Sequence, residues 1–467
     1  RCTRSTSTPN SKRPGSSSDT FTAAVAGIGR RPSEKCMKHS STQNHVNSYY
    51  AATRNQTGDY PILEELVECD VCVIGAGYTG LSSALFLSEA GYSVTVLEAA
   101  KVGFGASGRN GGQLVNSYSR DVDVIEERYG DKTAEVLGSM IFEGADIIRS
   151  RIKEYDIKCD YRPGGIFAAL NKKQLNGLAE QKRNWERYGN NNLKMLDASD
   201  IQREVGCDNY VGGLLDMQGG HIHPLNLALG EAAAIIRLGG KIYEQSAAVD
   251  ISYGEPITVR TAKGVVRAKY LLIAGNAYLP QDLDNRVTRK SMPCGSQIVV
   301  TEPLSEKIAR SLITNNYCVE DCNYLLDYYR LTADNRLLYG GGVVYGAREP
   351  DDIEQLIRPK ILKTFPQLKD VKIDYCWTGN FLLTMSRMPQ FGRIEKNAYY
   401  MQGYSGHGVT CSHLAGKLIS EMIRGDAERF DAFASLPHMP MLGGRTFQAP
   451  LTAMGAAYYA LRDRFGI

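Results

Sequence analysis

The stretch from Cys69 to Glu98 constrains the fold of this chain more than any other part of the sequence. An apolar run, Val71–Ile74, precedes the spacing G-x-G-x-x-G at Gly75, Gly77 and Gly80. Such a run is typical of a strand buried on both faces. The first glycine permits a tight turn, the second lets backbone approach a pyrophosphate, and the third lets helix and strand pack closely. The stretch therefore predicts a dinucleotide-binding strand, turn and helix.

The residues that follow complete this unit. Leu81–Ala90 continues as a helix, and Gly91 stands where a left-handed C-terminal cap belongs. A second strand, Ser93–Leu97, ends at Glu98, whose carboxylate is placed to accept hydrogen bonds from ribose hydroxyls. The alternative is a glycine-rich turn in another α/β fold. The cofactor contacts expected of this unit also include Ala76, Tyr78 and Thr79.

A glycine-rich loop, Gly103–Gln113, follows the ribose acid. Five glycines in eleven residues disfavour a helix or a strand, and such a loop exposes backbone N–H groups to a flat ligand. The alternative is a flexible surface linker. Cofactor contacts are expected from Ala106, Ser107, Gly108, Arg109, Asn110, Gly111, Gly112 and Gln113.

A second glycine-rich junction lies near the other end of the chain. The expected strand Tyr399–Gln402 leads into Gly403–Gly408, and a helix follows from about Thr410 to Arg424. A helix N-terminus stabilises negative charge, which a reduced flavin ring carries, whereas a nicotinamide enzyme does not need this distant loop. The second junction therefore favours FAD over NAD. Its expected cofactor contacts are Gly403, Gly406, His407, Gly408 and Val409. Two further contacts are expected elsewhere: Gly275, at the end of the buried strand Lys269–Gly275, and Val249, in the strand Ala247–Ile251.

The remaining segments alternate between helical and strand patterns. Asp121–Tyr155 has helical apolar spacing, and Asn323–Leu331 with Leu337–Val343 is typical of a hairpin. Further expected elements are a strand at Gly164–Leu170, helices at Lys172–Tyr188, Leu225–Leu238 and Ile353–Phe365, and a strand at Thr258–Thr261.

Composition describes an ordinary globular chain with an unusual first segment. Residues 1–36 carry seven Lys or Arg against two Asp or Glu, so the other 431 residues have a formal charge of −2 and no basic excess for nucleic acid. No apolar run approaches the length of a membrane span. We expect 1–36 to be a disordered or non-native tail, rich in Ser, Thr, Arg and Pro, and 37–68 to lead into the first strand.

Cysteines and histidines give no metal site. The eleven cysteines are scattered; Cys69 and Cys72 flank a buried strand, and Cys318 and Cys322 lack a second pair with zinc spacing. This usage fits a reducing cytosol, so a cytoplasmic location is expected. The alternating pair His221/His223 could be metal ligands, but without an evident third ligand a structural or substrate-lining role is favoured.

On these motifs the chain resembles the D-amino acid oxidase-like flavoprotein family. The likeness covers Ser48–Ile467, and its motifs are Gly75–Gly80, Phe104–Gln113, Gly219–Pro224, Trp377–Asn380 and Gly403–Gly408. It implies an α/β fold: a Rossmann-like FAD domain of discontinuous segments (69–155, 215–295 and 376–467) and an α+β substrate domain with an antiparallel sheet (156–214 and 296–375).

The resemblance also implies the chemistry. A primary amine is oxidised to an imine, which hydrolyses to an aldehyde and ammonia, and molecular oxygen reoxidises the flavin to give hydrogen peroxide. At its closest, the likeness implies that the substrate is putrescine carrying a gamma-glutamyl group. The alternatives are another small amine or amino acid, with oxygen or a quinone as acceptor, and a nonenzymatic flavin-binding protein.

Two departures from the family pattern bear on the site. Ser386–Pro389 stands where many members carry an acidic residue before the proline, which puts their carboxylate-handling pattern in doubt here. Some relatives attach the flavin through a cysteine near this region. Here Cys376 precedes the comparable position, near Asn380, so a noncovalent FAD is expected.

Catalysis requires a neutral amine, because the carbon next to nitrogen loses hydride only when the nitrogen lone pair is free. An amine with a pKa near 10.4 is neutral in about one molecule in a thousand at pH 7, and a desolvated pocket raises that fraction. His407 could polarise the ring, accept a proton or be structural. Tyr328, Tyr329 and Arg330 lie on a strand expected to face the substrate, where only alternate residues point inward. Tyr328 and Arg330, with His407, are the candidate catalytic residues, and the alternative is that the tyrosines only pack. A guanidinium is the preferred partner of a carboxylate such as that of a glutamyl group. The candidate arginines for binding it are Arg162, Arg330, Arg348 and Arg387.

Overall fold

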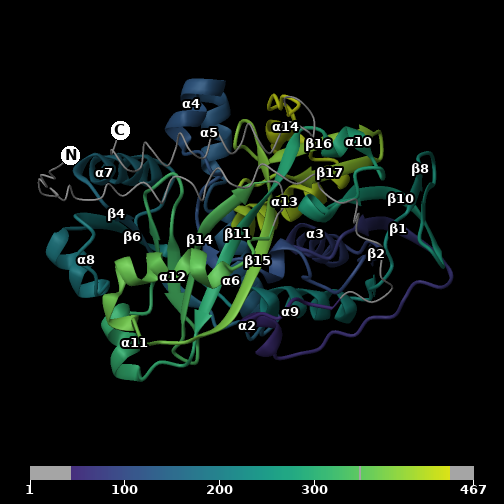
Figure 1. Ribbon diagram of the computed structural model, residues 1–467. Helices are drawn as coiled ribbons and strands as arrows, with labels where there is room; N and C mark the ends of the chain where they lie inside the picture. Colours follow the sequence, from purple (N-terminus) through teal and green to yellow (C-terminus); the bar gives the residue numbers. More distant parts are fainter. Residues whose placement is uncertain (1–43, 346–348, 442–467) are drawn as a thin grey trace, which may run out of the picture. The chain divides into compact units, whose positions relative to one another are not determined.

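Two β-sheets organise the part of the chain that the computed structural model describes, residues 44–345 and 349–441 (Figure 1). The expectations for residues 1–36, for Arg348 and for 442–467 lie outside these ranges. One sheet is mainly parallel and the other mainly antiparallel. The expected α/β fold, with a parallel sheet of separated segments and a second, antiparallel sheet, is confirmed.

The first sheet is built around β1 (Leu66–Ile74), the strand that precedes the glycine motif. β1 lies between β2 (Val94–Leu97) and β10 (Val265–Ile273) and is parallel to both. β7 (Lys241–Tyr243) extends the sheet beyond β2, and β17 (Ala398–Gln402) pairs in parallel with β10. The side chains of Val71–Val73 are fully buried, which is why this run is apolar throughout.

Antiparallel strands complete that sheet. β9 (Ile257–Arg260) pairs with the first half of β10 and with β8 (Asp250–Ser252), and β16 (Gln390–Glu395) pairs with β17. Short segments lie between the sheet elements: η1 (Ala106–Gly108), η2 (Asn276–Tyr278) and α10 (Asn285–Thr288).

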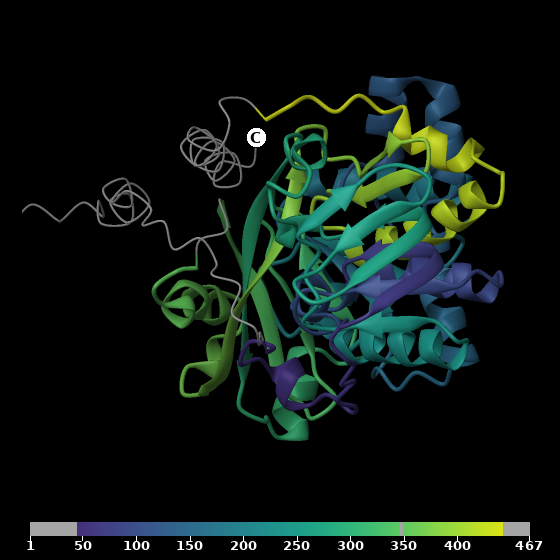
Figure 2. The ribbon, with the colours of Figure 1, turned by 90° about the vertical axis from the view of Figure 1, so that its right-hand side faces the viewer.

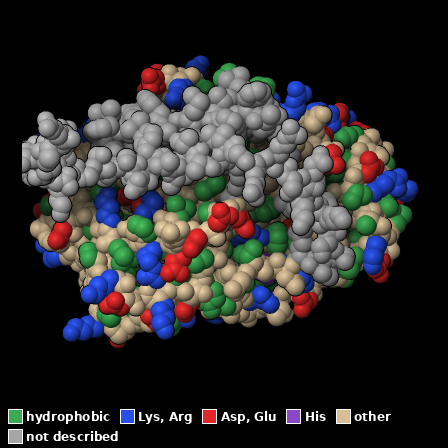
Figure 3. All heavy atoms as spheres, in the orientation of Figure 1, with side chains coloured by type: hydrophobic (Ala, Val, Ile, Leu, Met, Phe, Trp, Pro, Cys, Tyr) green, Lys and Arg blue, Asp and Glu red, His purple; other side chains and the backbone are tan. Residues whose placement is uncertain are grey.

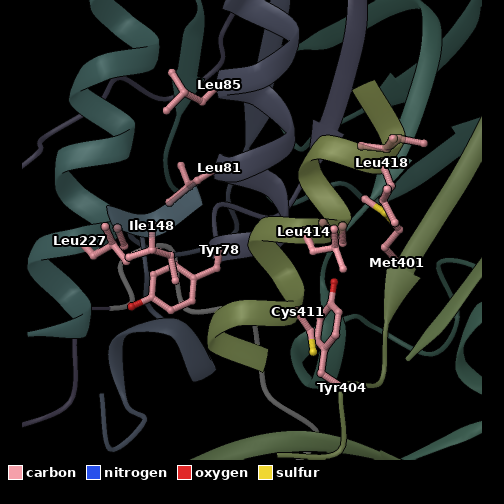
Figure 4. Packing of buried hydrophobic residues seen from close by; sticks show 14 of the residues in the cluster. Tyr78, Leu81, Leu85, Ile148, Leu227, Met401, Tyr404, Cys411, Leu414 and Leu418 are labelled. Atoms are coloured by element: carbon pink, nitrogen blue, oxygen red, sulfur yellow. The ribbon is translucent and has the colours of Figure 1, made fainter. Parts of the chain in front are cut away.

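Four helices pack together beside the first sheet. α3 (Tyr78–Glu89), which begins at the glycine motif, contacts α9 (Pro224–Arg237) and α13 (Gly408–Ile423), and α13 contacts α6 (Glu143–Glu154). Figure 4 shows this packing, with Leu81 and Leu85 of α3, Leu227 of α9, Ile148 of α6 and Leu414 of α13. Because α3 and α13 each follow a glycine-rich junction, their contact fixes the two junctions relative to each other.

The second sheet has the strand order β15-β11-β14-β13-β12-β4-β6-β3, with β5 paired to β6. Its neighbours are antiparallel except for β12 and β4, which run parallel. Figure 2 shows its green strands beside the purple and teal strands of the first sheet. The bounds are β3 (Gln113–Leu114), β4 (Arg162–Ala169), β5 (Leu193–Leu196), β6 (Gly212–His221), β11 (Ser291–Thr301), β12 (Cys318–Asp321), β13 (Tyr328–Leu331), β14 (Leu337–Tyr345) and β15 (Ile373–Thr384).

One face of the second sheet carries its own apolar core. Residues of β4, β13 and β14 pack there against helical segments, and the core includes Ile166, Tyr329 and Phe365. The helices and turns that accompany this sheet are α7 (Lys172–Arg187), α8 (Ala198–Glu204), α11 (Glu306–Leu312), α12 (Ile353–Thr364) and η3 (Pro366–Leu368).

The helical spacing expected over Asp121–Tyr155 is confirmed, but the stretch is divided. Three helices occupy this stretch: α4 (Val122–Tyr129), α5 (Asp131–Ser139) and α6. Gly130 separates the first two with a φ of 82°, a conformation open to glycine but costly for other residues, so it ends α4. The apolar spacing continues through the breaks because all three helices face the same core. The other expected helices and the hairpin are confirmed within a few residues.

Two further helices complete the described part. α2 (Tyr49–Ala52) lies in the expected lead-in, yet Tyr49 and Tyr50 are buried, so this segment belongs to the core. α14 (Glu428–Ala434) follows α13 and packs against β16.

Sheet membership suggests a refinement of the domain boundaries. The expected boundaries at 295/296 and 375/376 fall inside β11 and β15, and both strands belong to the second sheet. The boundary at 214/215 likewise falls inside β6. We propose that the substrate domain extends to the ends of these strands.

Candidate functional site

The first glycine junction has the backbone geometry that a pyrophosphate site needs. Gly75 has a φ of 106°, which turns the chain out of β1. A Cβ on Gly80 would lie 1.9 Å from the carbonyl oxygen of Gly75, so only glycine lets α3 pack this close to the strand end. Gly77 is the N-cap of α3 and supplies no side-chain hydrogen bond to the helix. The N-terminus of α3 is therefore a suitable place for an anion.

Glu98 lies at the end of β2, beside this turn. Its Oε2 accepts a hydrogen bond from the Ala76 N–H at 2.7 Å, and its Oε1 accepts one from Ala100 at 2.9 Å. Burial raises the pKa of the Glu98 carboxyl, and these N–H donors oppose that shift. Each oxygen has a second lone pair, so the carboxylate can still accept from ribose hydroxyls.

The loop after Glu98 is an ordered structure. The Ser107 hydroxyl oxygen accepts from the Tyr78 N–H at 2.8 Å and so joins the loop to the first turn of α3. The Asn110 side chain donates to the carbonyls of Ala106 and Ser107 and accepts from the Gly112 N–H. These bonds argue against the flexible-linker alternative.

Arg109 ties this loop to the second sheet. Its guanidinium lies 4.5 Å from the Phe104 ring centroid, and its Nε donates to the Phe104 carbonyl. The Arg109 carbonyl accepts from the indole N–H of Trp377 at 2.9 Å, and a Cβ on Gly379 would lie 3.0 Å from that same oxygen. The motif Trp377–Asn380 thus packs against the loop.

The second glycine junction lies next to the first. Gly403 and Gly406 have φ values of 74° and 103°, and the Gly403 N–H donates to the Asn276 side chain, just after Gly275. The hydroxyls of Tyr404 and Thr79 are 2.7 Å apart. The glycine-rich segments that are far apart in sequence are therefore in direct contact.

His407 is the N-cap residue of α13 and makes no side-chain cap. Its ring is partly buried, and its Nδ1 has no hydrogen-bond partner among residues 44–345 and 349–441. Burial lowers the pKa of His407 to about 4; the backbone at Ser405 opposes this, and Arg387 and Arg120 add to it. The imidazole is therefore neutral at pH 7 and is a weak proton acceptor.

A buried ionic cluster holds α13 against its neighbours. Glu231 Oε1, on α9, accepts from Arg151 of α6 at 2.9 Å and lies 3.1 Å from His413 Nε2, on α13. Burial alone would raise the pKa of Glu231, but His413 and Arg151 hold it below its usual range. The Ser82 hydroxyl, on α3, donates to the His413 carbonyl. The cluster thus connects the helices that follow both junctions.

Tyr328 and Arg330 face the cofactor loop, whereas Tyr329 faces the second core, as strand alternation predicts. A Cβ on Gly111 would lie 2.5 Å from the Tyr328 ring, and the Tyr328 hydroxyl lies 3.0 Å from that of Ser296. Burial raises the pKa of Tyr328, so the phenol is neutral.

Arg330 is 3 % exposed and holds protein carbonyls. Its guanidinium donates to the carbonyls of Gly111 at 2.7 Å, Ile222 at 2.9 Å and Leu331 at 3.2 Å, and to the Tyr50 hydroxyl at 3.1 Å. Four of its five N–H donors are thus engaged. We therefore change the proposed role of Arg330 from contacting substrate to holding the cofactor loop on the second sheet.

The other candidate arginines differ in setting. Arg162 is exposed, and Arg348 lies outside the described residues. Arg387 is partly buried, has a φ of 65°, and makes no side-chain ion pair or hydrogen bond within the described ranges. Val249, an expected cofactor contact, is 55 % exposed, and its neighbour Ala248 is buried. A cofactor role for Val249 stays a prediction.

His221 and His223 have structural partners. His223 Nδ1 accepts from the Asn226 N–H and caps α9, while His221 Nε2 lies 2.9 Å from the Asn316 carbonyl oxygen. Within the described ranges, no three His, Cys, Asp or Glu side chains form a group that could hold a metal ion.

The residues present fit FAD. Both glycine-rich junctions point helix N-termini without side-chain caps toward the same region, and three buried polar atoms around them, Gln113 Nε2, Asn380 Oδ1 and His407 Nδ1, have no partner in the described part. A flavin carries ring carbonyls and N–H groups that can satisfy such atoms, and its pyrophosphate suits the α3 N-terminus.

Sequence reasoning missed several residues that shape this site. Tyr404, Asn276 and Tyr278 connect the glycine loops, and the Tyr278 ring lies against Gly105. Glu320, on β12, was also missed. It lies opposite Tyr328 in the pairing of β12 with β13, so the two side chains share a face of the sheet, but this pairing could not be read from the sequence.

In the part of Figure 3 not covered by grey atoms, acidic and basic side chains are interspersed. Across the described residues, helices fall short of the length and apolar character that a membrane span requires.

Comparisons with known proteins agree with this site. A family model described as FAD dependent oxidoreductase (DAO) matches residues 70–422. The chain is 69 % identical over 423 residues to gamma-glutamylputrescine oxidoreductase of Escherichia coli (strain K12), covering 91 % of this chain and 99 % of the relative. It is 43 % identical over 428 residues to a probable oxidoreductase OrdL of Haemophilus influenzae, covering 91 % and 98 %.

A solved structure shows the same fold. Glycine oxidase from Geobacillus kaustophilus superposes with a TM-score of 0.65 at 19 % identity, covering 80 % of this chain and 100 % of that one. The chain is an oxidoreductase that belongs to the D-amino acid oxidase (DAO) family of FAD-dependent enzymes.

Proposed function

We propose that this enzyme oxidises the free primary amine of gamma-glutamylputrescine, in putrescine breakdown. The observation that carries the proposal is the 69 % identity, over 99 % of the relative's length, to an enzyme named for that substrate. The products would be gamma-glutamyl-aminobutyraldehyde and ammonia, with oxygen as acceptor and hydrogen peroxide as its product. Bound FAD would supply the acceptor for the hydride lost from the carbon next to nitrogen.

The residues around the glycine loops support amine oxidation. The Tyr328 ring packs against the loop at Gly111, and a site that loses water there on substrate binding would favour the neutral amine that the reaction needs. His407 is neutral and has an unpartnered ring nitrogen, so it can bind the flavin edge.

Arg387 is the candidate for binding the glutamyl carboxylate. Its guanidinium is without a protein partner in residues 44–345 and 349–441, it lies close enough to His407 to lower that residue's pKa, and its φ of 65° is unusual for a residue other than glycine. Such backbone strain is concentrated at functional sites. Because Arg330 is engaged by carbonyls, Arg387 is favoured over it.

Steady-state kinetics test the function. We expect kcat/KM for gamma-glutamylputrescine to exceed that for putrescine by about two to three decades, since a charge-paired contact contributes about 3–5 kcal/mol. Arg387→Ala should remove most of this preference with unchanged flavin content, and Arg162→Ala, at an exposed site, is the control. Equal kcat/KM for the two amines would remove the substrate assignment.

A broader screen decides between this substrate and another small amine. Oxygen consumption and peroxide release are measured with gamma-glutamylputrescine, putrescine, sarcosine and D-amino acids. Turnover of sarcosine or a D-amino acid above gamma-glutamylputrescine would reassign the enzyme. Turnover with a quinone but no peroxide would remove oxygen as the acceptor.

A further inference from the structure

A small pocket on the second sheet adjoins the cofactor loop. Its cavity volume is about 10 Å³, room for about one water-sized group such as an ammonium. Its wall begins with the residues that end the cofactor loop and continues across β4, β6 and β12. The lining includes Gln113, Val115, Phe167, Asp216, Gly219 and Glu320.

Glu320 reaches this pocket because of strand alternation. Its neighbour Val319 packs in the second core, on the opposite face of the sheet. Glu320 is directly opposite Tyr328 in the pairing of β12 with β13, so both side chains lie on the same face. Tyr328 in turn contacts the cofactor loop at Gly111.

The pocket is also close to the second glycine junction. Gln113 and Val115 continue directly from the cofactor loop, and the Val115 carbonyl accepts from the Thr410 hydroxyl, in the first turn of α13, at 2.7 Å. The pocket of Glu320 is thus bounded by the segment that follows the cofactor loop, and this segment is hydrogen-bonded to α13, the helix after the second glycine junction.

The Glu320 side chain is partly exposed, and its carboxylate has no hydrogen bond or ion pair to any side chain or N–H in the described ranges. The other acid of the pocket differs, because Asp216 accepts from Asn116, Asn190 and the Gln218 N–H. The pocket's lining contains no Lys, Arg or His. A carboxylate without a donor, in a pocket without a cationic side chain, favours a ligand that brings a positive charge.

We propose that Glu320 binds the ammonium group of the substrate and removes its proton. This inference rests on the proposed amine oxidation and names the residue that receives the reacting end. The ammonium N–H bond breaks and a carboxyl O–H bond forms, with no change in oxidation state. The amine is left neutral, with the free lone pair that hydride loss requires.

The electrostatics of the pocket suit this transfer. Burial raises the pKa of Glu320 to about 7, and the neighbouring Asp321 adds to the shift. The other titratable groups near it are the thiols of Cys318 and Cys322, the Tyr328 phenol on β13 and Asp216 on β6. In a site of low dielectric, an amine and a carboxylic acid are favoured over the ion pair.

Binding of an amine that cannot react tests the proposal. tert-Butylamine has no hydrogen on the carbon next to nitrogen, and tert-butanol is its neutral isostere. Absorbance of the FAD-loaded enzyme is titrated with each ligand for the wild type, Glu320→Gln and the control Glu306→Gln, which changes an exposed ion pair. We expect Glu320→Gln to weaken tert-butylamine binding by about tenfold to a hundredfold, as for loss of a hydrogen bond to a charge. Binding of tert-butanol, flavin content and the Glu306→Gln titrations should be unchanged.

The pH profile gives a second measurement. Below its pKa Glu320 is protonated and cannot take the substrate proton, so wild-type kcat/KM should fall as pH drops through about 7. Glu320→Gln should lose that limb. Equal tert-butylamine affinity in wild type and Glu320→Gln, or no binding to the wild type, would overturn the proposal. If kcat/KM shows no preference for gamma-glutamylputrescine, the tert-butylamine titrations can still succeed. The substrate assignment and the role of Glu320 are therefore tested separately.

Discussion

The hydroxyl groups of Tyr404 and Thr79 lie 2.7 Å apart, although 325 residues separate them in the sequence. Thr79 is in the first turn of α3, and Tyr404 is in the loop before α13. This bond therefore joins the two glycine-rich junctions directly. Both residues are buried, so water does not compete for the bond.

Breaking this bond should loosen the junctions. Tyr404→Phe or Thr79→Val should each lower the free energy of unfolding by about 1–3 kcal/mol, because a buried hydroxyl loses its partner. The double variant should lose less than the sum of the single ones. Urea unfolding of the FAD-loaded enzyme gives the three values, and additive losses would show that the two hydroxyls are not coupled.

Glu98→Ala should weaken retention of FAD. The change removes acceptors for ribose hydroxyls and leaves the N–H groups of Ala76 and Ala100 without their partner. At about 1.5–3 kcal/mol for each hydrogen bond to a charged group, the Kd for FAD should rise tenfold or more. Fluorescence titration of the apoenzyme measures it. The exposed Glu89→Ala is the control, and an unchanged Kd for Glu98→Ala would contradict the ribose role.

The flavin should be released by acid or heat. Burial raises the pKa of the Cys376 thiol to about 11 and that of Cys411 to about 12, so both are protonated and poorly nucleophilic at pH 7. The denatured polypeptide should show no flavin fluorescence on a gel. Fluorescence that stays with the chain would establish a covalent bond instead.

Arg330→Lys should reduce both stability and flavin content. Lysine cannot bridge the Gly111 and Ile222 carbonyls as the guanidinium fork does, so the cofactor loop loses its attachment. We expect a lower Tm and less bound FAD, with the exposed Arg310→Lys as the control. A variant that keeps its Tm and its FAD but has a raised KM would restore Arg330 as a substrate contact.

Stability should fall as the solution becomes acidic. Burial lowers the pKa of His221 and His223 to about 3, with Arg330 adding to the shift, whereas in the unfolded chain both titrate near 6.5. Between these values the unfolded state binds more protons, so the free energy of unfolding decreases as pH falls from about 6.5 toward 3 and is unaffected by these groups above that window. His221→Asn should flatten the dependence by up to about 1.4 kcal/mol per pH unit. An unchanged slope would show that His221 does not titrate this way.

The glycine unit could be predicted because each of its steps is local. A buried strand, three glycines and an acid at fixed spacing specify the turn and the helix, and Gly75, Gly80 and Glu98 occupy the expected places. The helix break at Gly130 was missed because an apolar stripe continues through it. The apolar spacing indicates which side of the helices faces the core, whereas the break depends on the φ angle of Gly130.

Contacts between distant strands could not be predicted from a single sequence. Arg330 was selected for its charge, but its partners are the backbone carbonyls of Gly111 and Ile222. Because every residue has such a carbonyl, the sequence does not indicate which ones an arginine will bind. Glu320 has no distinctive motif. Its role becomes visible only once β12 is paired with β13 and its carboxylate is found without a donor.

The interleaving of the two sheets has a consequence for synthesis on the ribosome. β1 is made early, but its sheet needs β10 and then β17, which ends at residue 402, and α13 follows only after that. The two domains therefore cannot emerge and fold one after the other, as domains made of continuous segments do. Cofactor capture is a late event in the life of each new chain. Until then the early strands have open edges, and protection by chaperones matters most in that interval.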